Sequence, residues 1–287
     1  MTAVGLLGLG LIGQAAASRL LAAGFAVTGH DPAAGRGAAL EARGGRAADP
    51  ATVWAGADPV LLAVFDAGQA EPVLAAAPEG AGRTALLLTT CDPPGVERLG
   101  RVAAGRGIAL VEAPISGTSA QLSAGGAVIY LAGDPAAVAR ARPVAEALCP
   151  KVEKVGALGQ GARVKLMVNL VLGLNRAALA EGLAFAEGGG LDPLRALDLL
   201  RGSAAAAAVM ATKGPKMARG DFAPEGRVAQ SAKDFGLILS QARAAGLGLP
   251  FARTYAAMME DCLAAGEGDL DNAAVIRAIR RAGGGDA

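Results

Sequence analysis

A glycine-rich hexapeptide near the start of the chain has the residue types and spacing of a phosphate-binding turn. It follows the apolar run 3–7 and consists of Gly8, Leu9, Gly10, Leu11, Ile12 and Gly13. In such a turn the first glycine permits a tight bend, the second lets the backbone approach a pyrophosphate, and the third lets a helix pack closely on a strand. The helix that follows offers free N–H groups and a positive dipole end to the phosphates.

An acidic residue, Asp31, ends the next apolar run and stands where the ribose of a dinucleotide binds. A carboxylate at this place accepts hydrogen bonds from the adenosine ribose hydroxyls. With 42 glycines in the chain, the hexapeptide alone could arise by chance. The full succession of strand, turn, helix, strand and acid favours a dinucleotide site. The carboxylate would repel the 2′-phosphate of NADP, so NAD is the expected cofactor. NADP remains possible because Arg36 lies nearby.

Hydride transfer to a carbonyl needs a proton donor, and lysine is the residue type that remains for this task. The single histidine, His30, precedes Asp31 in the cofactor turn and cannot also face the substrate. Neither Tyr130 nor Tyr255 has a lysine four residues on. The ligands of a catalytic zinc are missing as well, so no metal is expected.

Lys165 and Asn169 lie four residues apart in a long apolar stretch, so a helix places them on one face. Gly173 and Arg176 continue this narrow polar stripe. The stripe fits a surface that meets solvent. It also fits one side of a ligand site, because the stretch begins where one predicted domain ends, and ligand sites favour domain junctions. The spacing alone does not separate these two interpretations.

The elements that must position these residues fall into two sets. The first half alternates apolar runs with amphipathic stretches, which predicts a mostly parallel sheet covered on both faces. The expected strands are 3–7, 26–29, 59–65, 84–89, 108–112, 127–132 and 152–155, and the expected helices between them include 93–106 and 135–148. We therefore predict an α/β fold whose residues 1–160 form a Rossmann-type doubly wound sheet.

From about residue 161 onward the pattern is helical throughout. The expected helices are 162–187, 193–201, 204–218, 230–245, 251–265 and 272–281. Residues 161–287 are accordingly predicted to form an all-helical domain for substrate binding and oligomerisation, entered by the long helix.

Composition excludes several classes of partner. The chain has 287 residues, of which 53% are hydrophobic, and a formal net charge of +1. That charge lacks the electrostatic footprint of a nucleic-acid or anionic-membrane partner. No uninterrupted apolar run approaches the roughly 20 residues of a membrane span, and no signal peptide is apparent. Three cysteines without paired spacing indicate a reducing compartment, so a cytoplasmic protein is expected.

Four segments together resemble the β-hydroxyacid dehydrogenase family, which includes relatives of 3-hydroxyisobutyrate dehydrogenase, tartronate semialdehyde reductase and 6-phosphogluconate dehydrogenase. The first is the glycine turn with Asp31. The second, 112–118 (EAPISGT), is similar to the family's D-A-P-V-S-G-G loop, and the third, 159–169, matches its G-x-G-x-x-x-K-x-x-x-N helix. The fourth, 233–235 (KDF), is similar to K-D-L. Together they cover nearly the whole chain.

The resemblance implies a role for each matching residue. Lys165 would be the general acid or base, and Asn169, one turn on, would hold the substrate hydroxyl or carboxylate. Ser116 and the N–H groups of Gly117 and Thr118 would grip the substrate carboxylate. The remaining implied positions are Lys233, which would reach over cofactor and substrate, and Phe65 and Thr90, which would line the nicotinamide side. For the last two, ordinary packing at strand ends is nearly as good an interpretation.

Two departures from the family pattern bear on specificity. Thr118 replaces the second loop glycine, which should reshape the pocket, so that no relative's substrate transfers directly. Pro32 follows Asp31 where relatives that prefer NADP have arginine. The expected activity is hydride transfer between NAD(P) and a short carboxylate-bearing 3-hydroxy acid or its semialdehyde. The alternatives are an imine reductase of the same fold, which usually lacks the helix lysine, and a non-catalytic nicotinamide-binding protein. The resemblance also implies a homodimer or homotetramer.

Overall fold

A computed structural model describes residues 2–79 and 82–283. The chain divides into two compact units, residues 1–166 and 167–287. The division falls inside a long helix, six residues after the boundary expected from the sequence. The first unit is built on a sheet, and the described part of the second consists of helices and their connections.

The sheet of the first unit has the strand order of a dinucleotide-binding fold. Its strands are β1 (Ala3–Leu7), β2 (Ala26–His30), β3 (Arg46–Ala47), β4 (Val60–Leu62), β5 (Arg83–Leu87), β6 (Ile108–Glu112), β7 (Ile115–Ser116), β8 (Val128–Ala132) and β9 (Lys151–Gly156). The first six lie parallel in the order β3-β2-β1-β4-β5-β6. In such a sheet, ligands bind beyond the carboxyl ends of the strands where the order reverses, here at β1 and β4.

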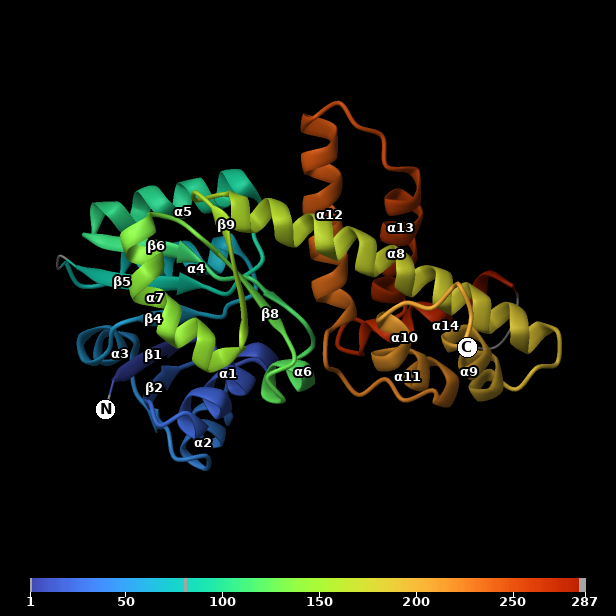
Figure 1. Cartoon of the computed structure of the whole chain (residues 1–287), viewed down its shortest axis with the longest axis horizontal. Coiled ribbons are helices and arrows are strands. Elements are labelled where there is room, and N and C mark those ends of the chain that lie inside the picture. The colour runs from blue at the N-terminus through green and yellow to red at the C-terminus, as the bar shows by residue number, and fades with distance from the viewer. Residues whose placement is uncertain (1, 80–81, 284–287) are drawn as a thin grey trace. The chain divides into compact units, whose positions relative to one another are not determined.

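Helices cover both faces of this sheet (Figure 1). They are α1 (Leu11–Ala22), α2 (Arg36–Glu41), α3 (Pro50–Gly56), α4 (Ala67–Ala75), α5 (Pro93–Gly105), α6 (Ser119–Ser123) and α7 (Pro135–Leu148). Successive strand residues point to opposite faces. Leu6 therefore packs in one core with α1, α6 and α7, while Leu7 packs in the other with α3, α4 and α5. Both faces are buried, which explains the continuous apolar strands.

The helical unit is built around its longest helix. Its elements are α8 (Gln160–Gly188), which begins in the first unit, α9 (Pro193–Arg201), α10 (Val209–Thr212), α11 (Gly214–Arg219), α12 (Val228–Ala244), α13 (Pro250–Ala264), a 3-10 turn (Asn272–Ala274) and α14 (Val275–Ala282). Figure 1 shows α12 and α13 as an antiparallel pair. A buried ion pair, with Lys213 Nζ 2.8 Å from both carboxylate oxygens of Asp271, connects α11 to the segment before α14.

Most predicted elements are present, but the predicted helix 204–218 begins later than expected and is divided into α10 and α11. The alanine run 204–208 is not helical, although alanine has the highest helix propensity. Helix α9 ends at Arg201, with Gly202 as its C-cap, and the Ser203 hydroxyl then accepts a hydrogen bond from the Ala205 N–H, which closes a turn. The short strands β3 and β7 were not predicted, because two residues carry no periodicity.

By length and hydropathy alone, α8 could cross a membrane. It has 29 residues, and its most apolar window has a mean hydropathy of 1.3. No membrane span was expected from the sequence, because Lys165, Asn169 and Arg176 interrupt the apolar residues of this helix. A third of that window is buried inside the protein. Leu179 and Leu183 of α8 are buried, so this part of the helix packs within the helical unit.

Candidate active site

The glycine turn 8–13 lies at the carboxyl end of β1, and its three glycines have different reasons to be there. Gly8 has φ +97°, and a Cβ on it would lie 2.5 Å from the Ala63 carbonyl oxygen, at the end of β4. A Cβ on Gly13 would run into the Gly8 carbonyl oxygen. A Cβ on Gly10, in contrast, would meet only the Arg36 guanidinium, 3.9 Å away. The protein itself leaves the space at Gly10 open.

This open space adjoins the start of α1. Gly10 is the N-cap residue of α1, and it supplies no side-chain hydrogen bond to the first turn. The N–H groups of a first helical turn have no partner within the helix, and they carry a partial positive charge. An anion that approaches over Gly10 therefore finds room, donors and favourable potential, so the turn fits the pyrophosphate of a dinucleotide.

Asp31, predicted to receive the ribose, is already bonded within the protein. Its Oδ2 accepts from the Leu9 N–H at 2.7 Å and from Arg36 Nη1 at 2.8 Å, and its Oδ1 accepts from the Ala33 N–H at 2.9 Å. Burial by itself would raise the pKa of this carboxyl, but these hydrogen bonds together hold the pKa below its usual value. The ribose end of the site thus presents an ion pair rather than a lone carboxylate, which weakens the reason for expecting NAD over NADP.

The predicted substrate loop follows β6. Gly117 has φ +152°, and a Cβ on it would lie 2.8 Å from that of Ala127, so only glycine fits. Thr118 caps α6 in a reciprocal pair: its hydroxyl accepts from the Gln121 N–H at 3.1 Å, and its own N–H donates to Gln121 Oε1 at 2.9 Å. The Thr118 N–H, expected to bind a substrate carboxylate, therefore already donates to Gln121. Its contact with substrate stays a prediction and requires Gln121 to turn away.

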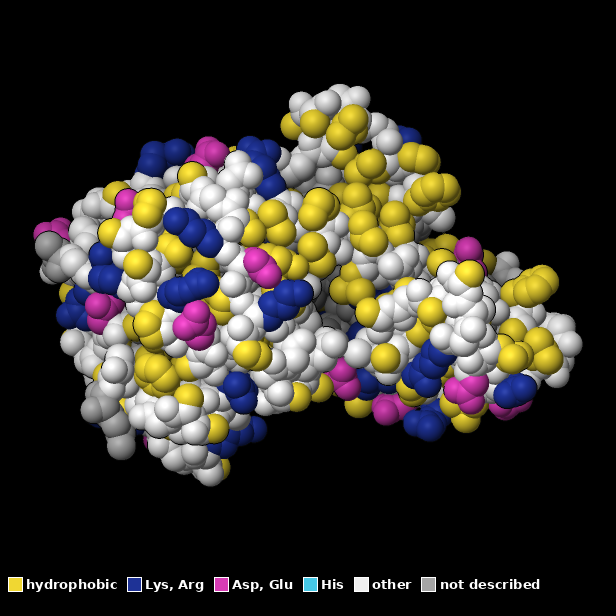
Figure 2. Space-filling model, in the orientation of Figure 1, with side chains coloured by type: hydrophobic (Ala, Val, Ile, Leu, Met, Phe, Trp, Pro, Cys, Tyr) yellow, Lys and Arg dark blue, Asp and Glu magenta, His cyan; other side chains and the backbone are white. Residues whose placement is uncertain are grey.

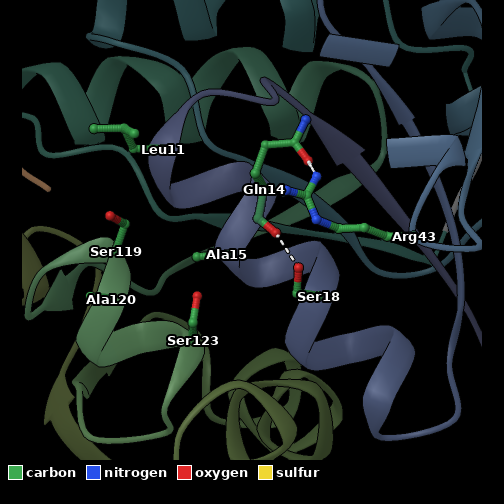
Figure 3. A pocket seen from close by; sticks show the side chains of 8 residues that line it. All are labelled: Leu11, Gln14, Ala15, Ser18, Arg43, Ser119, Ala120 and Ser123. Atoms are coloured by element: carbon green, nitrogen blue, oxygen red, sulfur yellow. Dashed lines mark hydrogen bonds between the residues drawn. The ribbon is translucent and has the colours of Figure 1, made fainter. Parts of the chain in front are cut away.

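The cofactor turn and the substrate loop lie close together, because α1 and α6 pack against each other. Between them is an open hollow of about 230 Å³ (Figure 3). Its lining residues are Leu11, Gln14, Ala15, Ser18, Arg43, Ser119, Ala120 and Ser123. Within it, Arg43 Nη1 donates to Gln14 Oε1 at 2.5 Å and the Ser18 hydroxyl donates to the Gln14 carbonyl oxygen at 3.0 Å. Helices α1 and α6, about a hundred residues apart in sequence, thus border one polar hollow.

The start of α8 is held by a carboxylate that the sequence did not single out. Glu112, 1% exposed, accepts hydrogen bonds from the N–H groups of Gly159 (2.5 Å), Gly161 (3.3 Å) and Ala162 (2.6 Å). Burial raises the pKa of this carboxyl, and the three N–H groups only partly offset that effect. Lys165 follows one turn later and is 8% exposed. The only signal in the sequence is an acidic residue at the end of a buried strand.

In the helical unit, Asp234 joins two of the predicted site residues. Its Oδ2 accepts from Asn169 Nδ2 at 2.8 Å, while its Oδ1 lies 3.0 Å from Lys233 Nζ and accepts from Gln230 Nε2 at 3.1 Å. Asp234 is 6% exposed. Asp234 therefore links α8 to α12.

The rest of the polar stripe on α8 also turns inward. The Phe235 ring packs directly on Gly173, and a Cβ at that position would lie 2.4 Å from two of the ring carbons. Arg176 donates a hydrogen bond to the Tyr255 hydroxyl. Both Gly173 and Arg176 are buried against α12 and α13. For these two positions the interpretation as a solvent-facing stripe was wrong.

Phe65 and Thr90 follow β4 and β5. Phe65 is 40% exposed, and its N–H donates to Gln69 Oε1 at 3.0 Å. Thr89, beside Thr90, donates its hydroxyl to the carbonyl oxygens of Leu62 (3.2 Å) and Val64 (3.1 Å), which ties the two strand ends together. Within residues 2–79 and 82–283, no three His, Cys, Asp or Glu side chains form a group that could hold a metal ion.

A parallel sheet in dinucleotide-binding order, an open glycine turn and a following helical unit define the class of NAD(P)-dependent dehydrogenases. Residues 3–156 match the model for the NAD binding domain of 6-phosphogluconate dehydrogenase. Residues 159–279 match the model for the NAD-binding domain of NADP-dependent 3-hydroxyisobutyrate dehydrogenase. The chain belongs to the β-hydroxyacid dehydrogenase family.

Relatives match over almost the full chain. L-threonate dehydrogenase of Cupriavidus necator is 33% identical over 96% of this chain and 95% of its own. 2-Hydroxy-3-oxopropionate reductase of Escherichia coli is 30% identical over 96% of both chains. The crystal structure of 3-hydroxyisobutyrate dehydrogenase from Salmonella typhimurium has a TM-score of 0.89 and 27% identity over 96% of this chain and 99% of its own. The protein is thus an NAD(P)-dependent hydroxyacid dehydrogenase.

Proposed function

We propose that this enzyme interconverts a short, carboxylate-bearing 3-hydroxy acid and its semialdehyde, with Lys165 as the general acid or base. The observation that carries the proposal is the position of Lys165 on α8. It stands at the lysine of the family's G-x-G-x-x-x-K-x-x-x-N pattern, one turn after the helix start and one turn before Asn169. The names of the relatives support the substrate class, since threonate and 2-hydroxy-3-oxopropionate are short hydroxylated carboxylates.

In this proposal the nicotinamide cofactor supplies or accepts the hydride, and the protein handles the proton. As an ammonium, Lys165 gives its proton to the carbonyl oxygen while that oxygen gains negative charge. In the oxidative direction, its neutral amine takes the proton from the substrate hydroxyl.

Asn169 and the substrate loop would position the substrate. The Asn169 nitrogen donates to Asp234, so the amide oxygen is the atom turned toward other partners and can accept from a substrate hydroxyl. Ser116 and the Gly117 N–H would bind the carboxylate as neutral donors. Thr118 would join them once Gln121 releases its N–H.

The test is a panel of substrates measured with NAD and with NADP. L-threonate, 2-hydroxy-3-oxopropionate and 3-hydroxyisobutyrate would be followed by absorbance of the reduced nicotinamide, beside the corresponding amides. Turnover of the acids but not the amides is expected. Cofactor binding without turnover would support a non-catalytic role. Reduction of cyclic imines in preference to the acids would support an imine reductase, against which the presence of Lys165 speaks.

We also propose that the enzyme is a homo-oligomer joined through the helical unit. Large apolar side chains on α8 remain exposed in the single chain: Met167 (59%), Val171 (55%) and Phe185 (86%). Figure 2 shows hydrophobic side chains gathered over the part of this unit that contains α8, α12 and α13. Exposed apolar surface of this kind is typical of an interface.

A further inference from the structure

We infer that Glu112 is a positioning residue for Lys165, because it fixes where α8 begins relative to the substrate loop. The inference rests on the proposed role of Lys165. Nothing in the motif comparison assigns a role to Glu112 itself. Its contacts, its burial and the glycines around it carry the argument.

The contacts make Glu112 the cap of α8. Both of its oxygens accept from backbone N–H groups of the first helical turn or the residue before it, at 2.5 to 3.3 Å. These N–H groups would otherwise lack partners, and the negative charge stands at the positive end of the helix dipole. Because the side chain is 1% exposed, water cannot replace it. The start of α8 is therefore held in one place.

The two glycines at the start of α8, Gly159 and Gly161, are explained by this carboxylate. Gly159 has φ +93°, a conformation that favours glycine, and its N–H donates to Glu112 Oε2. A Cβ on Gly161 would lie 2.9 to 3.0 Å from the Glu112 side chain, closer than real Cβ atoms approach. The G-x-G pattern and Glu112 thus form one structural unit, joined across nearly fifty residues of sequence.

Glu112 also belongs to the substrate loop. It is the last residue of β6, four residues before Ser116. Its bonds reach Ala162, three residues before Lys165. A single buried side chain therefore connects the segment proposed to hold the substrate carboxylate with the helix that carries the proposed acid. Misplacement of a catalytic group by about 1 Å can cost about 100-fold in rate.

The experiment compares Glu112→Gln with two other variants in the full-length enzyme. Glutamine keeps the volume but turns one acceptor oxygen into a donor that faces backbone N–H groups. We expect kcat to fall about 10- to 100-fold, while KM for the cofactor changes less than about twofold. Glu112→Asp, which keeps the charge on a shorter arm, should recover part of kcat. Asp134→Asn is the matched control, since Asp134 caps α7 in the same unit and should leave kcat unchanged.

A double variant shows whether Glu112 acts through Lys165. In a Lys165→Met background, Glu112→Gln should have little further effect on kcat, because the group that it positions is gone. Equal loss of kcat in both backgrounds would overturn the inference, as would a loss that only follows the folded fraction measured by circular dichroism. If Lys165→Met keeps full kcat, the proposed function fails instead. If Lys165→Met loses kcat but Glu112→Gln does not, only the inference fails.

Discussion

The Asn169 side chain donates from Nδ2 to Asp234 Oδ2 over 2.8 Å, and this bond sets the orientation of the amide. Asp234 has no proton to give when ionised, so the Asn169 nitrogen must face it and the oxygen must face away. The same carboxylate lies 3.0 Å from Lys233 Nζ. One buried acid thereby orients two residues that the sequence placed in the site.

Asp234→Asn is expected to raise KM for the substrate about tenfold, with a smaller effect on kcat. An asparagine at position 234 can turn its own NH₂ toward Asn169, so the Asn169 amide would no longer be held with its oxygen toward the substrate. The tenfold change corresponds to a loss on the order of 1.4 kcal/mol in the free energy of substrate binding. Steady-state kinetics would measure it. Gln230→Ala, which removes another partner of Asp234, is the control and should change KM little. An unchanged KM in Asp234→Asn would refute the orienting role.

Lys165→Met should lower kcat by about 10²- to 10⁴-fold, the usual contribution of a general acid or base. Cofactor affinity should stay near that of the wild type, because the turn from Gly8 to Gly13, proposed to hold the dinucleotide, is unchanged. Fluorescence titration with NADH or NADPH and single-turnover rates would separate the two effects. Lys154→Met, an exposed lysine of the same unit, is the control. Retention of kcat by Lys165→Met would make α8 a structural helix only.

Arg36→Ala should increase the preference for NAD over NADP roughly tenfold, because a charge-assisted hydrogen bond to the 2′-phosphate would be lost. Arg36 is bonded to Asp31 and has a partly exposed guanidinium that can reach a phosphate. The ratio of kcat/KM for the two cofactors is the measurement. A ratio unaffected by the substitution would mean that Arg36 serves only to hold Asp31.

Asp271→Asn should destabilise the protein by roughly 3–5 kcal/mol, because Lys213 would remain as an uncompensated buried charge. Burial alone would raise the pKa of Asp271, but Lys213 and backbone N–H groups hold that pKa below its usual value. A lowered pKa gives stability that is full above about pH 4 and disappears as the pH falls through the native value. Urea unfolding should therefore show a smaller difference in the free energy of unfolding between the wild type and Asp271→Asn at pH 3 than at pH 7. Asp261→Asn, in an exposed pair, is the control.

Phe185→Glu should shift the enzyme toward smaller assemblies, since it places a charge on the exposed apolar face of α8. Light scattering during gel filtration would report the mass. Phe251→Glu, which places a charge on exposed α13 of the same apolar surface, should have the same effect. A monomeric wild type would contradict the proposal directly.

Much of the backbone could be predicted from local pattern. Helix α7 was predicted from end to end, since Pro135 at its first position and the apolar spacing that follows are local signals. The strands β1 and β6 were likewise predicted in full. The run 204–208 failed because propensity is weak and the turn at Ser203 overrides it.

The sequence by itself determined the order of strands and helices, the glycine turn, and the candidates Lys165 and Asn169, because each depends on residues a few positions apart. Only the tertiary structure decided that Asp31 is paired with Arg36, that Gln121 occupies the Thr118 N–H, and that Asp234 orients Asn169. It also placed Glu112 beneath the start of α8. Hydrogen bonds such as the last two join residues some fifty or more positions apart, and spacing within one element carries no information about them.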